Sequence, residues 1–299
     1  MGAPHDAVRH ALGRVGVWTF GFDDRPAARV AGDVRAIEAM GYPALWIPEG
    51  SGSTDVLAQL SWLLASGERL TVASGIANVT ARAPEVLARG AALLSDAYGQ
   101  RLVLGIGIGH EYSTEHRGFA WARPLERMRA YLDGMDQVTG ERAPAPRILA
   151  ALGDRMLRLA AERALGAHTY FVPVEHTAHA RALLGPEPVL AVELGVLAAQ
   201  GEVAAGAVAR DWAQHYLALP NYASNWRRLG FDDADVADGG SDRLIEAAFA
   251  SGGADAVGAR VREHLDAGAD HVCVQVIGSD DGDEDVATLR QLAPTLLSL

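Results

Sequence analysis

The amino-acid sequence predicts an α/β protein of the (β/α)8 TIM-barrel class. Short runs of β-branched and aliphatic residues alternate with longer amphipathic stretches, which is the pattern of repeated βα units. A length of 299 residues, of which 49% are hydrophobic and 21% charged, suits one barrel with one large core. A doubly wound open sheet would show the same alternation, but eight units in this length favour closure. Because no Ser-, Pro- or acidic-rich linker interrupts the middle, we expect one barrel domain over residues 1–299.

The strands are predicted where β-branched and aliphatic residues cluster between turn residues. In chain order they are Val15–Phe20, Ala44–Pro48, Leu70–Ile76, Arg101–Ile108, Arg147–Ala151, His168–Val172, Val189–Glu193 and His271–Ile277. All eight would run parallel, since each is followed by a stretch long enough to return the chain.

The helices are predicted between these strands. They are Ala27–Met40, Val56–Ala65, Pro84–Ala97, Pro124–Val138, Arg155–Leu165, Thr177–Leu184, Glu202–Ala218 and Ala254–Ala267. Pro84 and Pro124 suit a first helical turn, whereas Gly41, Gly99, Gly166 and Gly268 suit helix ends.

One connection is abnormally long. About 77 residues separate the seventh and eighth strands, with a further helix predicted at Asp242–Ala250. We therefore expect a helical insertion over roughly residues 195–252. It would serve as a lid over the barrel mouth or as an oligomer contact, or be an inert elaboration.

The charge balance excludes several functions. The net charge is −12, with one local acidic run at Asp280, Asp281, Asp283, Glu284 and Asp285, which disfavours nucleic acid or an anionic membrane as the partner. All 26 basic residues are arginine, so a Schiff-base lysine and a phosphate-loop lysine are ruled out, and a phosphate-binding aldolase-like barrel is disfavoured.

The single cysteine indicates a reducing compartment. Cys273 lies in an apolar run and cannot form an internal disulfide. The segment Met1–Arg14 has no signal-peptide apolar stretch, and nowhere do 18 apolar residues follow one another. We expect a cytoplasmic protein.

The active site of a barrel lies at the carboxyl ends of its strands. No metal is expected there, because the histidines show no ligand spacing beyond His176 and His179, which lack convincing further ligands. No Gly-x-Ser-x-Gly elbow is present. The glycines Gly105, Gly107 and Gly109 clear one face of a strand, so that a flat ring or a backbone can approach closely, although G-x-G-x-G is not a dinucleotide fingerprint. Such a mouth suits an organic cofactor.

Several segments, in order and at barrel spacing, carry a family resemblance. They are Leu45-Trp-Ile-Pro-Glu-Gly50, Gly75-Ile-Ala-Asn78, Ala81-Arg-Ala-Pro84, Arg101-Leu-Val-Leu-Gly-Ile-Gly-Ile-Gly-His110, Ala150-Ala-Leu-Gly153 with its helix to Ala161, Tyr170-Phe-Val172, Glu175-His-Thr-Ala178, Tyr216-Leu-Ala-Leu-Pro-Asn-Tyr222 and Ala267-Gly-Ala-Asp-His-Val272. The chain resembles the luciferase-like monooxygenase superfamily, and within it the actinobacterial deazaflavin (F-420)-dependent oxidoreductases. The resemblance also implies a homodimer.

The resemblance implies where a flavin or deazaflavin ring would lie. It would rest on a bulge of the third strand with a non-prolyl cis peptide, by position Ser74–Gly75. Its surroundings would be Ser74, Gly75, Ala77, Asn78, Gly107, Gly109, His110 and Tyr170 with Phe171, with backbone donors of Ala150, Ala151 and Gly153 facing the ribityl phosphate. The missing lysines depart from relatives that use Lys and Arg around this phosphate.

The candidates for proton transfer are Glu49 and His110, with Glu193 next. A carboxylic acid in an apolar mouth resists ionisation and an imidazole titrates near neutrality, so either could protonate a substrate. Trp18, Phe20, Arg82 and Glu193 are predicted to line the substrate pocket, and Arg82 would clamp the following helix or hold an anionic group.

Three functions remain open from sequence. The first is hydride transfer between the deazaflavin coenzyme F-420 and a small organic substrate. The second is a reduced-FMN monooxygenase that activates oxygen, in either case with a separate flavin or deazaflavin reductase as a partner. The third is a non-catalytic flavin-binding barrel.

Overall fold

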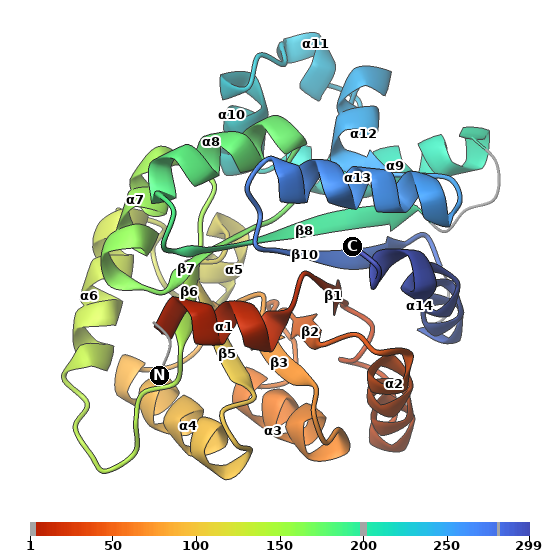
Figure 1. The fold of residues 1–299 in the computed structure, drawn as a ribbon. Helices are drawn as coiled ribbons and strands as arrows, with labels where there is room; N and C mark the ends of the chain where they lie inside the picture. Colours follow the sequence, from red (N-terminus) through yellow and green to blue (C-terminus); the bar gives the residue numbers. More distant parts are fainter. Residues whose placement is uncertain (1–3, 198–201, 280–281) are drawn as a thin grey trace.

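The computed structural model describes residues 4–197, 202–279 and 282–299 (Figure 1). Its main strands are β1 (Val15–Trp18), β2 (Ala44–Ile47), β3 (Thr71–Ser74), β5 (Leu102–Gly107), β6 (Arg147–Ala150), β7 (Gly166–Thr169), β8 (Val189–Leu197) and β10 (His271–Ile277). They pair in parallel in this order, and β10 pairs with both β8 and β1. The ring is closed, which confirms the barrel and excludes the open sheet.

Two short strands extend the barrel beyond the predicted eight. β4 (Ala77–Asn78) pairs with the end of β5, and β9 (Phe249–Ala250) pairs with β8. The prediction of a helix over Asp242–Ala250 was therefore too long: α12 ends at Ala248, and the next two residues add to the sheet.

The helices surround the barrel (Figure 1). They are α1 (Pro4–Leu12), α2 (Ala27–Met40), α3 (Val56–Ser66), α4 (Pro84–Ala97), α5 (Glu111–His116), α6 (Pro124–Asp136), α7 (Asp154–Arg163), α8 (Val174–Leu184), α9 (Glu202–Leu217), α10 (Pro220–Arg228), α11 (Asp233–Val236), α12 (Asp242–Ala248), α13 (Ala254–Asp266) and α14 (Gly282–Leu296). Pro84 and Pro124 stand in first turns, and Gly41 ends α2 at a φ of 99°, as predicted. Gly166, predicted to end a helix, instead begins β7. None of the described helices is both long and apolar enough to cross a membrane.

Five helices were not predicted from the sequence: α1, α5, α10, α11 and α14. Helix α1 covers the end of the barrel opposite the mouth, where Val8 and Leu12 pack on the innermost side chains of the strands. Helix α14 begins at Gly282 and contains the rest of the predicted acidic run, of which Asp280 and Asp281 lie outside the described residues.

Alternate strand residues point into the barrel and out toward the helices. The inward set includes Trp18, Trp46, Val103, Ala191 and Cys273, which form one buried cluster. A larger cluster joins the outward residues to the helices. The parity of each strand therefore identifies which residues near its carboxyl end face the mouth.

The predicted insertion is present as α9, α10, α11, α12 and β9 between β8 and β10, and α10, α11 and α12 lie together at the top of Figure 1. Its apolar side chains form a third cluster with Phe171, which follows β7. The insertion thus packs on the carboxyl end of the barrel, as the lid interpretation requires. Residues 198–201 lie outside the described residues.

Candidate active site

The inward residues at the mouth divide it into two unlike halves. On β3, β5 and β6 they are small, with Gly75, Gly107 and Ala150 at the last positions. On the neighbouring β7, β8 and β10 they are large and polar, with Tyr170, Glu193 and Gln275. We call these the small half and the polar half of the mouth.

The small half is built around a bulge after β3. The chain has a cis peptide bond between Gly75 and Ile76, so the predicted position, Ser74–Gly75, was wrong by one residue. The Gly75 amide still donates to the Ile47 carbonyl at 2.7 Å, which keeps the Ser74–Gly75 peptide in the sheet; the chain leaves it only afterwards. Gly75 and Ile76 are both partly exposed at the mouth.

The β5 glycines make room for this bulge. A Cβ on Gly105 would lie 1.9 Å from the Ser74 carbonyl oxygen, and one on Gly107 would lie 2.3 Å from Ile76 Cγ1. A neighbouring backbone, one of the two approaches predicted for these glycines, is observed at Gly105, whereas the Ile76 side chain fills the space beside Gly107.

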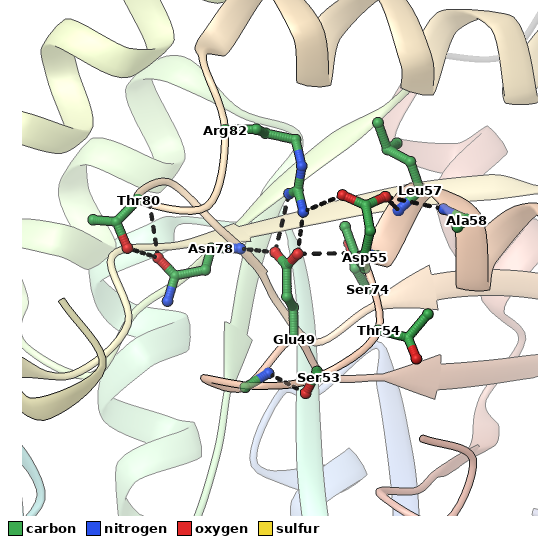
Figure 2. A network of polar contacts seen from close by, with 12 residues as sticks. Glu49, Ser53, Thr54, Asp55, Leu57, Ala58, Ser74, Asn78, Thr80 and Arg82 are labelled. Carbon is green, nitrogen blue, oxygen red and sulfur yellow. Dashed lines mark hydrogen bonds and ion pairs between the residues drawn. The ribbon is translucent and has the colours of Figure 1, made fainter. Parts of the chain in front are cut away.

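The Glu49 carboxylate holds the loops beside this bulge together (Figure 2). Its Oε1 accepts hydrogen bonds from Arg82 Nη2 and, at 3.3 Å, from the Val56 amide. Its Oε2 accepts from Arg82 Nη1 at 3.0 Å and from the Asn78 amide at 2.8 Å. With both oxygens engaged and its side chain only 3% exposed, Glu49 acts as a structural anion rather than a proton donor.

Arg82 is likewise committed to structure. Its Nη2 also donates to Asp55 Oδ2 at 2.9 Å, and Asp55 caps the N-terminus of α3. Burial alone would lower the pKa of Arg82, but hydrogen bonds and charge attraction from Glu49 and Asp55 outweigh it and raise the pKa. Arg82 was predicted to clamp the following helix or to hold an anionic group; its side chain instead joins Glu49 to Asp55 at the start of α3.

His110 lies beyond β5, where its ring stacks on Tyr112 and approaches Tyr222, with centroids 5.7 and 5.8 Å away. Burial, with a smaller effect from His215, lowers the pKa of His110 to about 4. Its buried Nδ1 has no hydrogen-bond partner among the described residues. The ring is therefore neutral at neutral pH and can accept a proton or a hydrogen bond, but it cannot act as an acid.

The polar half carries a hydrogen-bonded chain. The Tyr170 hydroxyl donates to Gln275 Oε1 at 2.9 Å and lies 3.0 Å from the Tyr216 hydroxyl. Glu193 Oε2 accepts from the Phe171 amide at 3.0 Å. Burial raises the pKa of Glu193 to about 8, against the opposing effect of that amide. Glu193 is therefore a neutral carboxylic acid at neutral pH.

An aromatic wall borders the polar half. Trp18 contacts Phe20 and Tyr170, with centroids 4.6 and 5.2 Å apart, and Phe20 meets Trp212 of α9 at 5.9 Å. Phe20 is 43% exposed, whereas Trp18 is buried inside the barrel beside Gly75. The predicted pocket residues Trp18, Phe20 and Glu193 are thus brought together on one side.

A basic group lies at the start of α7. A Cβ on Gly153 would lie 3.6 Å from Nη1 of Arg228, which comes from α10 of the insertion. Arg228 Nη2 donates to Asn225 Oδ1 at 2.8 Å, and the buried Asn225 Nδ2 has no partner among the described residues. The N-terminal turn of α7 and this guanidinium together suit an anion.

Three predicted cofactor contacts are not supported. Ser74 is fully buried and its hydroxyl donates to the Gly105 carbonyl at 2.8 Å. Ala77 is buried between the barrel and its helices. The Ala151 amide donates to the His168 carbonyl at 3.0 Å, so it cannot serve a phosphate. All three residues lie near strand ends in the sequence. Their side chains or amides, however, pack or form hydrogen bonds within the barrel and do not face the mouth.

Asn78 and Gly109 pack against each other below the surface of the mouth. Asn78 is 2% exposed and its Oδ1 accepts from the Thr80 amide and hydroxyl at 2.9 and 2.8 Å. Gly109 has a φ of 73°, and a Cβ there would lie 2.3 Å from Asn78 Nδ2. These two residues, predicted to contact the cofactor, therefore support the loops of the mouth through their contacts with each other and with Thr80.

Tyr216, Gln275 and Arg228 were not among the predicted site residues. Gln275 is the polar residue inside an otherwise apolar strand, at the inward parity of Cys273, and this signal could have identified it. Tyr216 and Arg228 come from the insertion, whose placement no local pattern reveals. Among the described residues no group of three or more His, Cys, Asp or Glu side chains could hold a metal ion.

The comparison with known families identifies the chain. A family model described as luciferase-like monooxygenase matches residues 14–271. The chain belongs to this family. Its closed barrel with the bulge after β3 is therefore the luciferase-like fold, and the mouth described above is the candidate site of a luciferase-like protein.

Individual relatives are more distant. A 5,10-methylenetetrahydromethanopterin reductase of Archaeoglobus fulgidus is 27% identical over 149 residues, 43% of this chain and 45% of that protein. A putative coenzyme F-420-dependent oxidoreductase of Mycobacterium tuberculosis is 28% identical over 144 residues, 48% of this chain and 40% of that protein. The matches thus span less than half the length of these curated relatives.

One solved structure supports the fold over nearly the whole chain. An F-420-dependent secondary alcohol dehydrogenase, in complex with an F-420–acetone adduct, superposes with a TM-score of 0.72 at 12% identity. The similarity covers 95% of this chain and 98% of the other. At this identity it establishes the shared barrel alone.

Proposed function

We propose that this luciferase-like protein is an oxidoreductase that binds the deazaflavin coenzyme F-420 at its mouth and transfers hydride to or from a small organic substrate. The observation that carries the proposal is the small half of the mouth, where the partly exposed Gly75–Ile76 segment offers a flat surface. The relative named as F-420-dependent supports this cofactor over FMN.

The residues present fit such a group. A Cβ on Gly75 would lie 2.5 Å from Trp18 Nε1 and 3.2 Å from His168 Nε2, so only glycine fits beside these two inward side chains. Both nitrogens are buried without partners among the described residues. Gly153 and Arg228 would hold the phosphate of the cofactor. The Arg228 guanidinium would supply the positive charge that lysines supply in other members of the family.

The chain's own groups would orient the ring and exclude water. When bound and reduced, the deazaflavin supplies a hydride. Gly75, Ile76 and Ala150 would support one side of it, and His110 would accept a hydrogen bond at its edge. The aromatic wall from Trp18 to Tyr170 would keep the opposite side dry, which strengthens electrostatic interactions with the substrate.

Titration of the protein with F-420 and with FMN, followed by the quenching of cofactor fluorescence, tests this proposal. We expect saturable one-site binding of F-420 that is tighter than that of FMN. Tighter FMN binding with oxygen consumption would instead establish the monooxygenase, and binding without turnover with any substrate would establish a non-catalytic barrel.

The variant Arg228→Gln tests the phosphate end. We expect it to weaken binding of either cofactor about tenfold, since a charge-assisted hydrogen bond contributes about 1.5–3 kcal/mol and part of it is lost to solvent screening. Arg227→Gln is the matched control, because Arg227 is the neighbouring residue and pairs with Asp233 instead. Equal binding by both variants would remove Arg228 from the site.

We extend the proposal to a cytoplasmic homodimer that acts on a small molecule and receives its reduced cofactor from a separate reductase. The exposed Val86 and Leu93 are two turns apart on one face of α4, and the exposed Trp62 lies on the neighbouring α3. Light scattering should give twice the mass of one chain, and Leu93→Glu should halve it; a monomer would refute the dimer.

A further inference from the structure

The polar half of the mouth carries three inward side chains on neighbouring strands. Tyr170 follows β7, Glu193 lies on β8 opposite Cys273, and Gln275 lies two residues further along β10. They share the inward parity of Ala191 and Cys273. Glu193 thus faces the barrel axis, across the mouth from the flat surface at Gly75.

Glu193 has no cation to hold it ionised. Its one hydrogen bond among the described residues comes from the Phe171 amide to Oε2, and it takes part in no ion pair there. Glu193 as a whole is only 3% exposed to solvent. Transfer of a lone carboxylate into such surroundings is costly, so the acid keeps its proton instead.

The groups packed against Glu193 from other elements are also uncharged. They are Tyr170 beyond β7, Tyr216 of α9, Tyr222 of α10, and Cys273 and Gln275 of β10. Burial raises the pKa of all three tyrosines and of the thiol, so none ionises near neutrality. The half of the mouth opposite the flat surface therefore has hydrogen-bonding capacity but no charge.

The other proton-transfer candidates are unsuited to donate. Both carboxylate oxygens of Glu49 accept hydrogen bonds, and two of these bonds come from the Arg82 guanidinium. Glu49 therefore has no proton to offer a substrate. His110 is neutral. Glu193 is the candidate that already carries a proton and faces the barrel axis.

We propose that Glu193 is the acid of this site, and that its substrate is an uncharged carbonyl compound bound between Gly75 and the side chains of Tyr170, Glu193 and Gln275. The proposal rests on the hydride transfer proposed above. Among the described residues the polar half offers no cation to an anionic substrate, and a cationic one would meet Glu193 as a neutral acid.

The step balances with the reduced deazaflavin as the two-electron donor. The Glu193 carboxyl passes its proton to the carbonyl oxygen while the carbonyl carbon accepts hydride. The C=O π bond breaks and one C–H and one O–H bond form, which yields an alcohol and the oxidised cofactor. The Glu193 carboxylate then takes a proton from water.

The protonated state can be measured without cofactor. The infrared spectrum of the protein should contain a carboxylic-acid C=O band that disappears as the pH rises from about 6 to about 10, centred near the Glu193 pKa of about 8. Glu193→Gln should lose this band and Glu162→Gln, at an exposed site, should keep it. A spectrum unchanged by Glu193→Gln would overturn the proposal whatever the cofactor.

The catalytic role is tested with reduced F-420 and three probes: cyclohexanone and menadione, which are uncharged, and pyruvate, which is an anion. We expect turnover of an uncharged probe in preference to pyruvate, a loss of kcat of about 100-fold or more in Glu193→Gln, and partial recovery in Glu193→Asp. The wild-type rate should fall above about pH 8 while the rate of Glu193→Gln stays flat.

The outcomes separate the two proposals. Failure of F-420 to bind refutes the proposed function and leaves the infrared result to decide the state of Glu193. Normal F-420 affinity with wild-type kcat in Glu193→Gln overturns Glu193 as the acid. Preference for pyruvate, or no turnover of either uncharged probe by protein that binds F-420, overturns the substrate class.

Discussion

Replacing Arg82 by methionine is expected to lower the free energy of unfolding by about 3–5 kcal/mol, because it strands the Glu49 carboxylate in a buried site without its cation. The side chains of the pair are only 8% and 3% exposed. Methionine keeps much of the apolar stem, so the loss comes from charge rather than from a cavity. Urea unfolding, followed by circular dichroism, measures the change.

The double variant Arg82→Met/Glu49→Gln should be more stable than Arg82→Met alone, since no buried charge is then left unpaired. Arg129→Met is the control: its partner is Glu162, the two side chains are 43% and 55% exposed, and the cost should stay within about 1 kcal/mol. Equal midpoints for Arg82→Met and Arg129→Met would show that the Glu49–Arg82 pair does not hold the mouth loops.

For the Glu49–Arg82 pair, the sequence predicted the positions of the two residues but not their bond. The positions of Glu49 and Arg82 near strand ends were sufficient to place both near the mouth. That they bond each other, and so are unavailable for substrate, depends on the loop geometry around Asn78 and Val56, which no local pattern encodes.

The strands were predictable because eight apolar runs, separated by helix signals, leave few alternatives to a barrel. The direction each side chain faces was also present, as the period-two alternation within each strand. Applied to Val189–Leu197, that alternation places Glu193 with Ala191 inside the barrel. What it could not give was the protonation state, which depends on the insertion that covers Glu193 with Tyr216 and Tyr222.

Short polar helices such as α5 escaped prediction because they bury too few residues to show an apolar period. Helix α14 is different: its Leu289, Leu292 and Leu296 follow helical spacing and pack on the barrel, so its signal was available. The one-residue error at the cis peptide has a backbone cause, the Gly75–Ile47 hydrogen bond, and no side-chain signal.

Acid is expected to unfold this protein well above pH 4, because four histidines are buried in the neutral form. They are His168, His176, His264 and His271, and burial lowers their pKa values to about 3, 4, 3 and 4. One ring nitrogen of each bonds to a carbonyl or hydroxyl, and the second nitrogen of the first three has no partner among the described residues. Protonation would place a cation in each of these sites.

The number of protons bound in the folded and unfolded states decides how the free energy of unfolding changes with pH. Below about pH 6.5 the unfolded chain binds protons at these histidines that the folded chain does not, so the free energy of unfolding falls as the pH falls. Each histidine contributes about 1.4 kcal/mol per pH unit, and four together would remove a typical total stability of about 5–15 kcal/mol within a few units.

Glu193 acts in the opposite direction. Its pKa of about 8 lies above its ordinary value of 4.5, so its stabilisation of the fold is complete below pH 4.5 and is lost progressively as the pH rises from 4.5 to about 8. One carboxyl cannot offset four histidines below pH 6.5, but above it this group alone of the five still titrates. The five groups together therefore give a stability maximum near pH 6.5, with a steep acid side and a shallow alkaline side.

Urea midpoints measured from about pH 4.5 to about pH 9 should trace this shape. His264→Gln should make the acid side less steep by about a quarter, because His110 also has a lowered pKa and Glu193 offsets one histidine in this range. Glutamine can keep the bond to the Thr177 hydroxyl without taking up a proton. His116→Gln, on the short helix α5 at the surface, should leave the slope unchanged. Glu193→Gln should flatten the alkaline side up to about pH 8 and make the acid side steeper, because this carboxyl opposes the histidines between pH 4.5 and 6.5. A profile that is level between pH 4.5 and 6.5 would mean that these histidines are solvated, and with them the interior on which the dry, uncharged mouth depends.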